Sequence, residues 1–161
     1  MKVSEPMDTC KAEGANAVYE IVVFGAPMGK ERPRATSFGG HARIYTPKKT
    51  QSYEARFSSE WNTKYPSQEP LTEALIVDIW CYFPLLKSDY KKDGSFTKSG
   101  TRKLDGVEKP TKKPDADNIA KAVLDGLNGI AFVDDSQVTS LSVHKRYSYK
   151  PRVKVTISSD K

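Results

Sequence analysis

Residues 112–129 read KKPDADNIAKAVLDGLNG, and residues 134–137 read DDSQ. Between Asp115 and Asp135 this stretch holds five aspartates and one lysine, whereas the whole chain carries a formal net charge of +6. A concentration of carboxylates in a basic protein suggests a bound divalent cation that faces a polyanion.

The pattern of apolar residues in this stretch predicts a helix over residues 118–128. Helical spacing is shared by Ile119, Ala120, Val123, Leu124 and Leu127. Asp117 is a favourable N-cap residue, and Pro114 disfavours helix for the residue before it. Asn128 and Gly129 form a C-terminal stop signal.

The same spacing predicts where the second acidic pair lies. A helix of this length carries the chain about 16 Å away from Asp117, and an extended segment 130–134 would carry it back by roughly the same distance. We therefore expect Asp134 and Asp135 to return to the level of Asp115. Lys121 is expected one turn into the helix, on its polar face. Three or four carboxylates and one ammonium would then converge on one end of the helix.

Length and composition predict one globular domain. The chain has 161 residues, of which 37% are hydrophobic and 29% charged, and we expect residues 1–17 to be a flexible tail ahead of a domain over 18–161. No apolar run reaches membrane-spanning length and the N-terminus lacks a signal-peptide core, so we expect a cytoplasmic protein without a membrane partner. Cys10 and Cys81 lack metal-site spacing, which fits a reduced compartment.

Two basic segments flank the acidic stretch. Residues 30–49 hold six lysines and arginines against one acid, and residues 145–154 hold five against none. This arrangement suits contact with a phosphate backbone on either side of a metal site, although a charged run is also typical of a solvated face. The predicted DNA contacts are Lys30, Arg32, Arg34, Lys48, Lys49, Lys112 and Lys113.

The remaining patterns predict an α+β fold with a single domain, in which two main helices pack on a small mixed β-sheet. Runs of β-branched and aromatic residues predict strands over 18–24, 74–83, 138–147 and 152–157, and a hairpin turned by Gly39 and Gly40 that ends at 42–45. Thr46 and Pro47 begin a second helix that runs to about Tyr65.

Three features allow two interpretations. Tyr53, Phe57 and Trp61 recur every four residues, which indicates a core stripe more than a platform for stacking bases. Asp78, inside a nearly continuous apolar strand, either has a structural partner or faces the acidic site. Residues 84–113 hold nine basic residues against four acids and predict a long basic loop, a flexible flap that orders on its partner or a disordered segment.

Each acidic pair has a simple explanation by itself. Asp115 and Asp117 are explained as a helix cap and a first-turn acid, and Asp134 with Asp135 as a turn. Their joint geometry favours a cation, because crowded carboxylates repel one another unless a cation or a proton intervenes. Mg²⁺ is the natural choice because it takes oxygen ligands and keeps waters. Zinc is not indicated, since the two histidines are isolated and no cysteine is near.

Residues 113–129, followed by 134–138, closely resemble the signature of RusA-type Holliday junction resolvases. The segments 29–34 and 45–50 resemble the N-terminal part of the branch found in bacterial prophages, and the matches together span residues 18 to about 157. The resemblance implies a homodimeric endonuclease, dependent on Mg²⁺ with Mn²⁺ as a possible substitute. Such an enzyme cuts four-way DNA junctions with paired symmetric nicks. We expect each cut to proceed by attack of a metal-activated water on the phosphodiester.

Carried over by motif, the resemblance makes Asp115, Asp117 and Asp135 the metal-binding catalytic residues, with Lys121 essential beside them. The long 84–113 segment and the N-terminal tail depart from compact members of that family. Two alternatives stay open. The protein could be a basic DNA-binding module without catalysis, in which the aspartates only cap a helix and form a turn. It could also be a metal-dependent nuclease for other branched DNA, such as flaps or forks.

Overall fold

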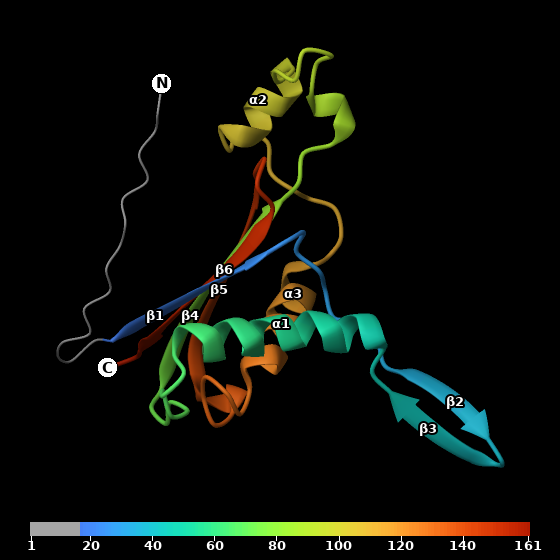
Figure 1. Cartoon of the computed structure of the whole chain (residues 1–161), viewed down its shortest axis with the longest axis vertical. Helices are drawn as coiled ribbons and strands as arrows, with labels where there is room; N and C mark the ends of the chain where they lie inside the picture. Colours follow the sequence, from blue (N-terminus) through green and yellow to red (C-terminus); the bar gives the residue numbers. More distant parts are fainter. Residues whose placement is uncertain (1–16) are drawn as a thin grey trace.

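The computed structural model describes residues 17–161 (Figure 1). Residues 1–16, which include Cys10 and nearly all of the predicted tail, lie outside the described residues. The described chain has a four-stranded sheet with two long helices on one face, a separate two-stranded hairpin, and a small helical segment beyond the strand ends. This confirms the predicted α+β fold with a small mixed sheet in one domain.

The sheet contains the four strands that the β-branched and aromatic runs predicted. They are β1 (Val18–Phe24), β4 (Leu75–Phe83), β5 (Val138–Tyr147) and β6 (Arg152–Ser159), in the order β1-β6-β4-β5. β4 and β5 are parallel, and the other two pairings are antiparallel. A parallel pair needs a crossover. Helix α3 (Ala116–Leu127) supplies it, running back from the end of β4 to the start of β5.

Helices α1 (Lys48–Lys64) and α3 pack against each other, and together with the sheet they enclose the core. α1 buries Tyr53, Phe57 and Trp61, which confirms that the aromatic stripe belongs to the core. The alternate residues of β4 that face the helices include Cys81, and burial raises the pKa of its thiol to about 12. Cys81 is therefore an unreactive core residue.

The hairpin formed by β2 (Arg34–Phe38) and β3 (His41–Tyr45) projects away from the sheet (Figure 1). Gly39 and Gly40 turn it with φ angles of 61° and 82°, a region in which glycine is free of steric cost. Both strands are exposed throughout, so the hairpin confirms the prediction but adds nothing to the core.

Residues 84–113 are not the structureless basic loop that their composition predicted. The segment contains a 3-10 turn, η1 (Lys87–Asp89), and helix α2 (Lys98–Leu104). Between them the Lys103 ammonium lies 2.9 Å from both carboxylate oxygens of Asp89, and these residues are only 6% and 1% exposed. A buried ion pair organises the segment where an apolar pattern is missing.

Asp78 fits neither predicted role. It lies part-exposed on the face of β4 that points away from the helices, between Ser142 of β5 and Thr156 of β6. In the described part of the chain, no helix has both the length and the apolar character that a membrane span requires.

Candidate functional site

The acidic stretch begins α3 two residues earlier than predicted. Asp115, rather than Asp117, is the N-cap residue, and its side chain makes no capping hydrogen bond. Asp117 lies in the first turn with a side chain that is 68% exposed, and Lys121 places its ammonium 3.4 Å from the Asp117 carboxylate. Since the Asp115 carboxylate does not close the helix end, helix capping does not explain why this pair is present.

These side chains line a cleft of about 520 Å³ at the N-terminal end of α3. The loop between β1 and β2 forms the opposite wall. The cleft is lined by Lys30, Glu31, Arg32, Pro33, Asp115, Asp117, Asn118, Lys121 and Asp125. Five of the predicted site residues, three from α3 and its cap and two from the basic loop, are thereby brought together.

The basic loop reaches the acidic helix because of a close backbone approach at Gly29. A Cβ atom at this position would lie 3.0 Å from the Pro114 Cβ and 3.2 Å from the Asn118 Cβ. The next backbone N–H, that of Lys30, donates to the Asn118 carbonyl at 3.1 Å. Sequence reasoning gave Gly29 no role of its own. The available signal was a glycine directly before the basic residues.

Lys30 fastens this loop to both helices. Its ammonium pairs with Asp125 of α3 and lies 3.6 Å from Glu54 of α1. The hydrogen bond that Lys30 donates to the Asp125 carboxylate raises the pKa of Lys30, while burial raises the pKa of the Glu54 carboxyl. The predicted phosphate contact at Lys30 is thus already engaged with two carboxylates.

A second lysine holds the chain that leads into Asp115. The Lys145 ammonium, from β5, donates to the carbonyls of Lys112 and Pro114 at 2.7 and 2.9 Å. Sequence reasoning placed Lys145 only within a basic run. Strand alternation was the signal that could have found it, because Lys145 shares the helix-facing side of β5 with Val143.

The structure does not bring Asp134 and Asp135 into this cleft. Residues 130–133 form a tight turn instead of an extended return, because Phe132 is buried in the core and its carbonyl accepts from the Gly129 N–H. Asp135 therefore stays beyond the C-terminal end of α3, about 18 Å of helix from Asp115. Among residues 17–161, no three or more His, Cys, Asp or Glu side chains are grouped to hold a metal. The predicted convergence of a third carboxylate within one chain is wrong.

The two aspartates of this pair differ in their surroundings. The Asp134 carboxylate accepts a hydrogen bond from the Ser136 hydroxyl, which lowers the pKa of Asp134. Its backbone N–H donates to the Gln137 side chain at 2.9 Å, so Asp134 shapes the 3-10 turn η2 (Asp135–Gln137). Asp135 is exposed. Asp134 thus stabilises the η2 turn, whereas the Asp135 side chain is exposed to solvent.

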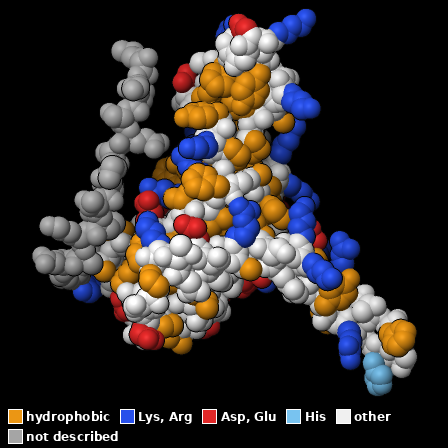
Figure 2. Space-filling view, in the orientation of Figure 1, with side chains coloured by type: hydrophobic (Ala, Val, Ile, Leu, Met, Phe, Trp, Pro, Cys, Tyr) orange, Lys and Arg blue, Asp and Glu red, His pale blue; other side chains and the backbone are white. Residues whose placement is uncertain are grey.

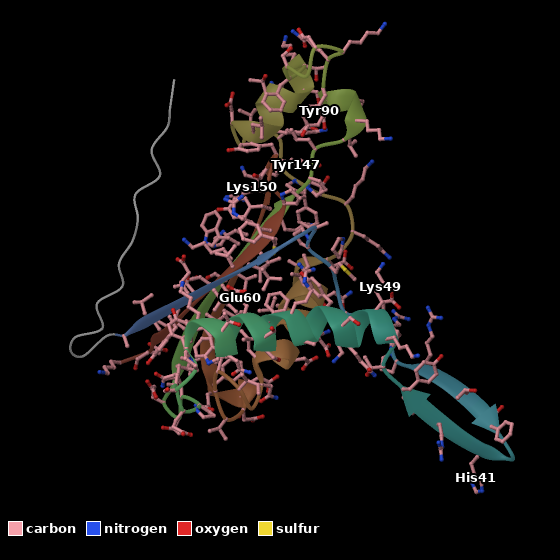
Figure 3. All side chains as sticks on the ribbon, viewed as in Figure 1. His41, Lys49, Glu60, Tyr90, Tyr147 and Lys150 are labelled. Atoms are coloured by element: carbon pink, nitrogen blue, oxygen red, sulfur yellow. The ribbon has the colours of Figure 1, made fainter. Side chains whose placement is uncertain are left out.

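The other predicted DNA contacts lie outside the cleft, and all of them are exposed. They are Arg34 at the start of β2, Lys48 and Lys49 at the start of α1, and Lys112 and Lys113 before α3. Figure 3 labels Lys49 at the N-terminal end of α1. Figure 2 shows lysine and arginine side chains along the edge of the molecule that runs from the α2 segment to the hairpin. The acidic residues of the cleft therefore lie within a basic surround.

Two comparisons bear on this arrangement. A family model described as "Endodeoxyribonuclease RusA" matches residues 25–158, a range that contains the basic loop, the cleft and the strands behind it. The uncharacterized protein YqaN of Bacillus subtilis (strain 168) is 34% identical over 139 residues, which cover 86% of this chain and 94% of the relative. The chain therefore belongs to the RusA family of endodeoxyribonucleases.

Proposed function

We propose that the protein is a Mg²⁺-dependent endonuclease that resolves four-way DNA junctions by paired symmetric nicks. One observation carries this proposal. Asp115, Asp117 and Lys121 share a single cleft with Arg32 at the open N-terminal end of a helix, and Lys30 holds the loop that forms the opposite wall. Carboxylates that hold a cation, beside ammonium and guanidinium groups that attract phosphate, are what phosphodiester hydrolysis requires.

The donor atoms of the cleft fit Mg²⁺. Asp115 and Asp117 supply carboxylate oxygens, and among residues 17–161 no histidine or cysteine lines the cleft. Mg²⁺ is usually held by one or two carboxylates together with waters and substrate phosphates, and Mn²⁺ accepts the same ligands. When bound, the ion would lower the pKa of a coordinated water and withdraw charge from the scissile phosphate.

The basic residues take different tasks. Lys121, whose ammonium pairs with Asp117 and whose side chain is 63% exposed, can turn toward the charge that develops on the phosphate oxygens. Arg32 and the exposed cations around the cleft hold the DNA backbone without reading bases. Lys30 and Lys145 act as positioning residues, because their ammonium groups fix the two chain segments that form the walls.

The separation of Asp135 from the cleft leads us to place two copies of the chain in the working enzyme. A two-fold axis perpendicular to α3 would set the two helices antiparallel. The partner subunit's Asp135 would then lie beside Asp115 and Asp117 as the third carboxylate. A dimer of this kind presents two equivalent sites to a junction that is itself two-fold symmetric, which accounts for paired cuts.

The test compares a synthetic four-way junction with a linear duplex of the same sequence, with and without Mg²⁺. We expect nicks in the junction alone and only with the metal. Asp117→Asn should keep its affinity for the junction and lose activity by about 100-fold or more, because a metal ligand is lost. Asp105→Asn, an exposed aspartate beyond α2, is the matched control and should cut normally.

Two outcomes would replace this function. Binding without cutting under every condition would identify a DNA-binding module. Faster cutting of flaps or forks than of four-way junctions would identify a nuclease for other branched DNA.

A further inference from the structure

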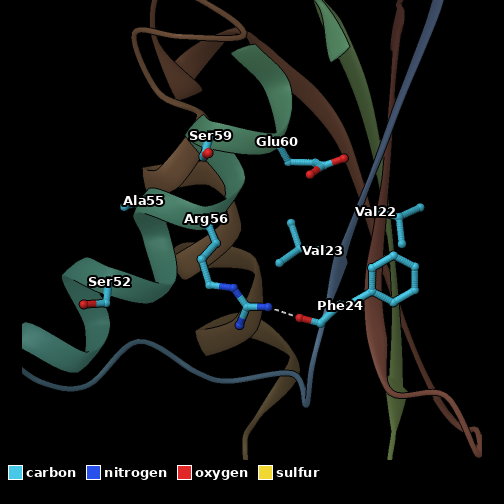
Figure 4. Close-up of a pocket in the computed structure, with 8 residues that line it drawn as sticks. All are labelled: Val22, Val23, Phe24, Ser52, Ala55, Arg56, Ser59 and Glu60. Carbon is cyan, nitrogen blue, oxygen red and sulfur yellow. Dashed lines mark hydrogen bonds between the residues drawn. The ribbon is translucent and has the colours of Figure 1, made fainter. Parts of the chain in front are cut away.

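One face of the sheet is left open by the described residues. Both long helices pack on the other face, toward which alternate residues such as Val23 point. Figure 4 shows Val23 directed at α1, across a cleft of about 410 Å³, whereas Val22 and Phe24 extend on the opposite side of β1. Residues of the same parity on the neighbouring strands therefore share this open face.

The strand register places two rows of side chains across one end of the open face, where β1, β4 and β5 end and β6 begins. One row is Arg146, Tyr82, Arg152 and Phe24, and the next is His144, Trp80, Lys154 and Val22. We use the name platform for six of these residues: Phe24, Trp80, Tyr82, His144, Arg146 and Arg152. Each is at least partly exposed, and Phe24 is 56% exposed.

The platform residues are stacked on one another. The Trp80 and His144 rings are parallel within 19°, with centroids 4.2 Å apart. The Arg152 guanidinium lies 4.0 Å from the centre of the Tyr82 ring, and that of Arg146 lies 5.4 Å from the Trp80 ring. These contacts fix flat groups side by side on a rigid sheet, so that little side-chain freedom is lost when a ligand binds.

The cations of the platform lack acidic partners. Arg146 and Arg152 donate to the main-chain carbonyls of Lys145 and Lys150, and no carboxylate of residues 17–161 lies within ion-pair distance of either. Lys154 differs, since Glu20 neutralises it at 2.8 Å. A guanidinium stacked on a ring keeps N–H donors in its own plane for a phosphate.

The platform borders a cleft at the edge of the same open face. This cleft of about 500 Å³ is bordered by Phe24, Arg152 and Tyr149, the last 70% exposed. Lys150, labelled in Figure 3, lies over the Phe24 ring at 5.9 Å. Exposed rings and cations without acidic partners therefore continue from the platform into this cleft, which also contains the ion pair between Glu20 and Lys154.

We propose that the platform is a second DNA-binding surface and that its ligand is single-stranded DNA. Cations without acidic partners favour a polyanion and disfavour a second copy of the same face, because like charges repel. The exposed Phe24 ring and the partly exposed edges of the other rings favour bases that are free to stack, whereas duplex bases are already stacked on each other. The platform lies at the sheet end where Lys145 holds the cleft, but on the opposite face. A strand unpaired near a junction could pass from one surface to the other.

The two tryptophans allow a direct test, because Trp61 is buried in the core at 1% exposure and Trp80 lies on the platform. Trp61→Phe leaves Trp80 as the sole fluorophore. Titration with short oligo-dT in EDTA, where no cleavage occurs, should quench this fluorescence with saturation. In Trp80→Phe only Trp61 emits, and the phenylalanine ring can still stack with a base. The same titration should therefore leave the emission unchanged.

A pair of variants separates the platform from general charge. Arg146→Ala with Arg152→Ala should weaken oligo-dT binding about tenfold and flatten its salt dependence. Lys91→Ala with Lys92→Ala removes the same charge from an exposed part of the 84–113 segment and should have little effect. Circular dichroism of each variant confirms that the fold is intact.

Three results would overturn the proposal. The first is Trp80 fluorescence that does not respond to oligo-dT. The second is a matched duplex that quenches Trp80 as strongly as the single strand. The third is a platform variant that no longer sediments as a dimer but binds DNA as tightly as wild type. That result would make this face an interface between copies of the chain. None of these results depends on whether the α3 cleft cuts DNA, so the two proposals fail separately.

Discussion

At the residue scale, the pair formed by Asp89 and Lys103 holds together a segment that has few apolar side chains. Burial raises the pKa of Asp89, but hydrogen bonds from the Lys103 ammonium and the Leu86 N–H outweigh it, and the net pKa is lowered. Asp89→Asn would leave a buried ammonium without its counter-charge. We expect this change to cost about 3 kcal/mol of the stability of residues 84–113.

Limited proteolysis measures this effect. Cleavage within residues 84–113 should become faster in Asp89→Asn, whereas Lys98→Met, an exposed lysine on the same helix, should behave as wild type. Because Asp89 has a lower pKa in the folded state than in the unfolded state, its contribution is present at neutral pH and is lost as the pH falls below about 4. Below that pH, wild type and Asp89→Asn should be cleaved at the same rate. Equal cleavage rates at pH 7 would show that the pair is not needed.

At the element scale, the contact between α1 and α3 supports the cleft, and Gly126 makes it possible. A Cβ atom at residue 126 would lie 2.6 Å from the Glu54 carbonyl oxygen. The Ser58 hydroxyl also donates to the Gly126 carbonyl. Gly126→Ala would therefore push the helices apart, and we expect a loss of about 1–3 kcal/mol in the free energy of unfolding.

Denaturant unfolding checks this value, with Ser52→Ala on the exposed side of α1 as the control. The same displacement separates Glu54 and Asp125 from Lys30, so the variant should also bind junction DNA less tightly. A Gly126→Ala protein as stable as the control would contradict the close packing of the two helices.

Sequence patterns predicted most of the elements, for identifiable reasons. The four sheet strands, the hairpin and both long helices carry periodic apolar residues or glycine turns, which are local signals. Helix α2 carries no such pattern. It is anchored by the ion pair between Asp89 and Lys103, which lie 14 positions apart in the chain and leave no local signal. The turn after α3 was also beyond local reasoning. Residues 130–134 could either extend or fold back, and they fold back because Phe132 is buried in the core.

The candidate site was predicted in part. Asp115, Asp117 and Lys121 are close because helix geometry fixes their spacing, and Gly29 brings Lys30 and Arg32 to them. The position of Asp135 depends on tertiary packing, which spacing along the chain does not encode.

At the scale of the whole molecule, the distribution of charge suits an endodeoxyribonuclease, whose substrate is a polyanion. A basic edge reaches the exposed hairpin (Figure 2), and the cleft at the N-terminal end of α3 combines Asp115 and Asp117 with Arg32 and Lys121. One copy of the chain places Asp115 and Asp117 at one end of α3 and Asp135 beyond its other end. A metal site that also contains Asp135, as we propose, therefore needs two copies of the chain.

The most direct measurement mixes two inactive variants, Asp117→Asn and Asp135→Asn, by co-expression and assays the dimers on a supercoiled plasmid that extrudes a cruciform. Wild type should linearise the plasmid, and each variant alone should leave it intact. A mixed dimer contains one site with all of its carboxylates, so we expect single nicks and an open circle. Mixing Asp115→Asn with Asp117→Asn, which leaves no complete site, should stay inactive. An intact plasmid in the first mixture would contradict a site shared between subunits, and wild type without activity would contradict the nuclease itself.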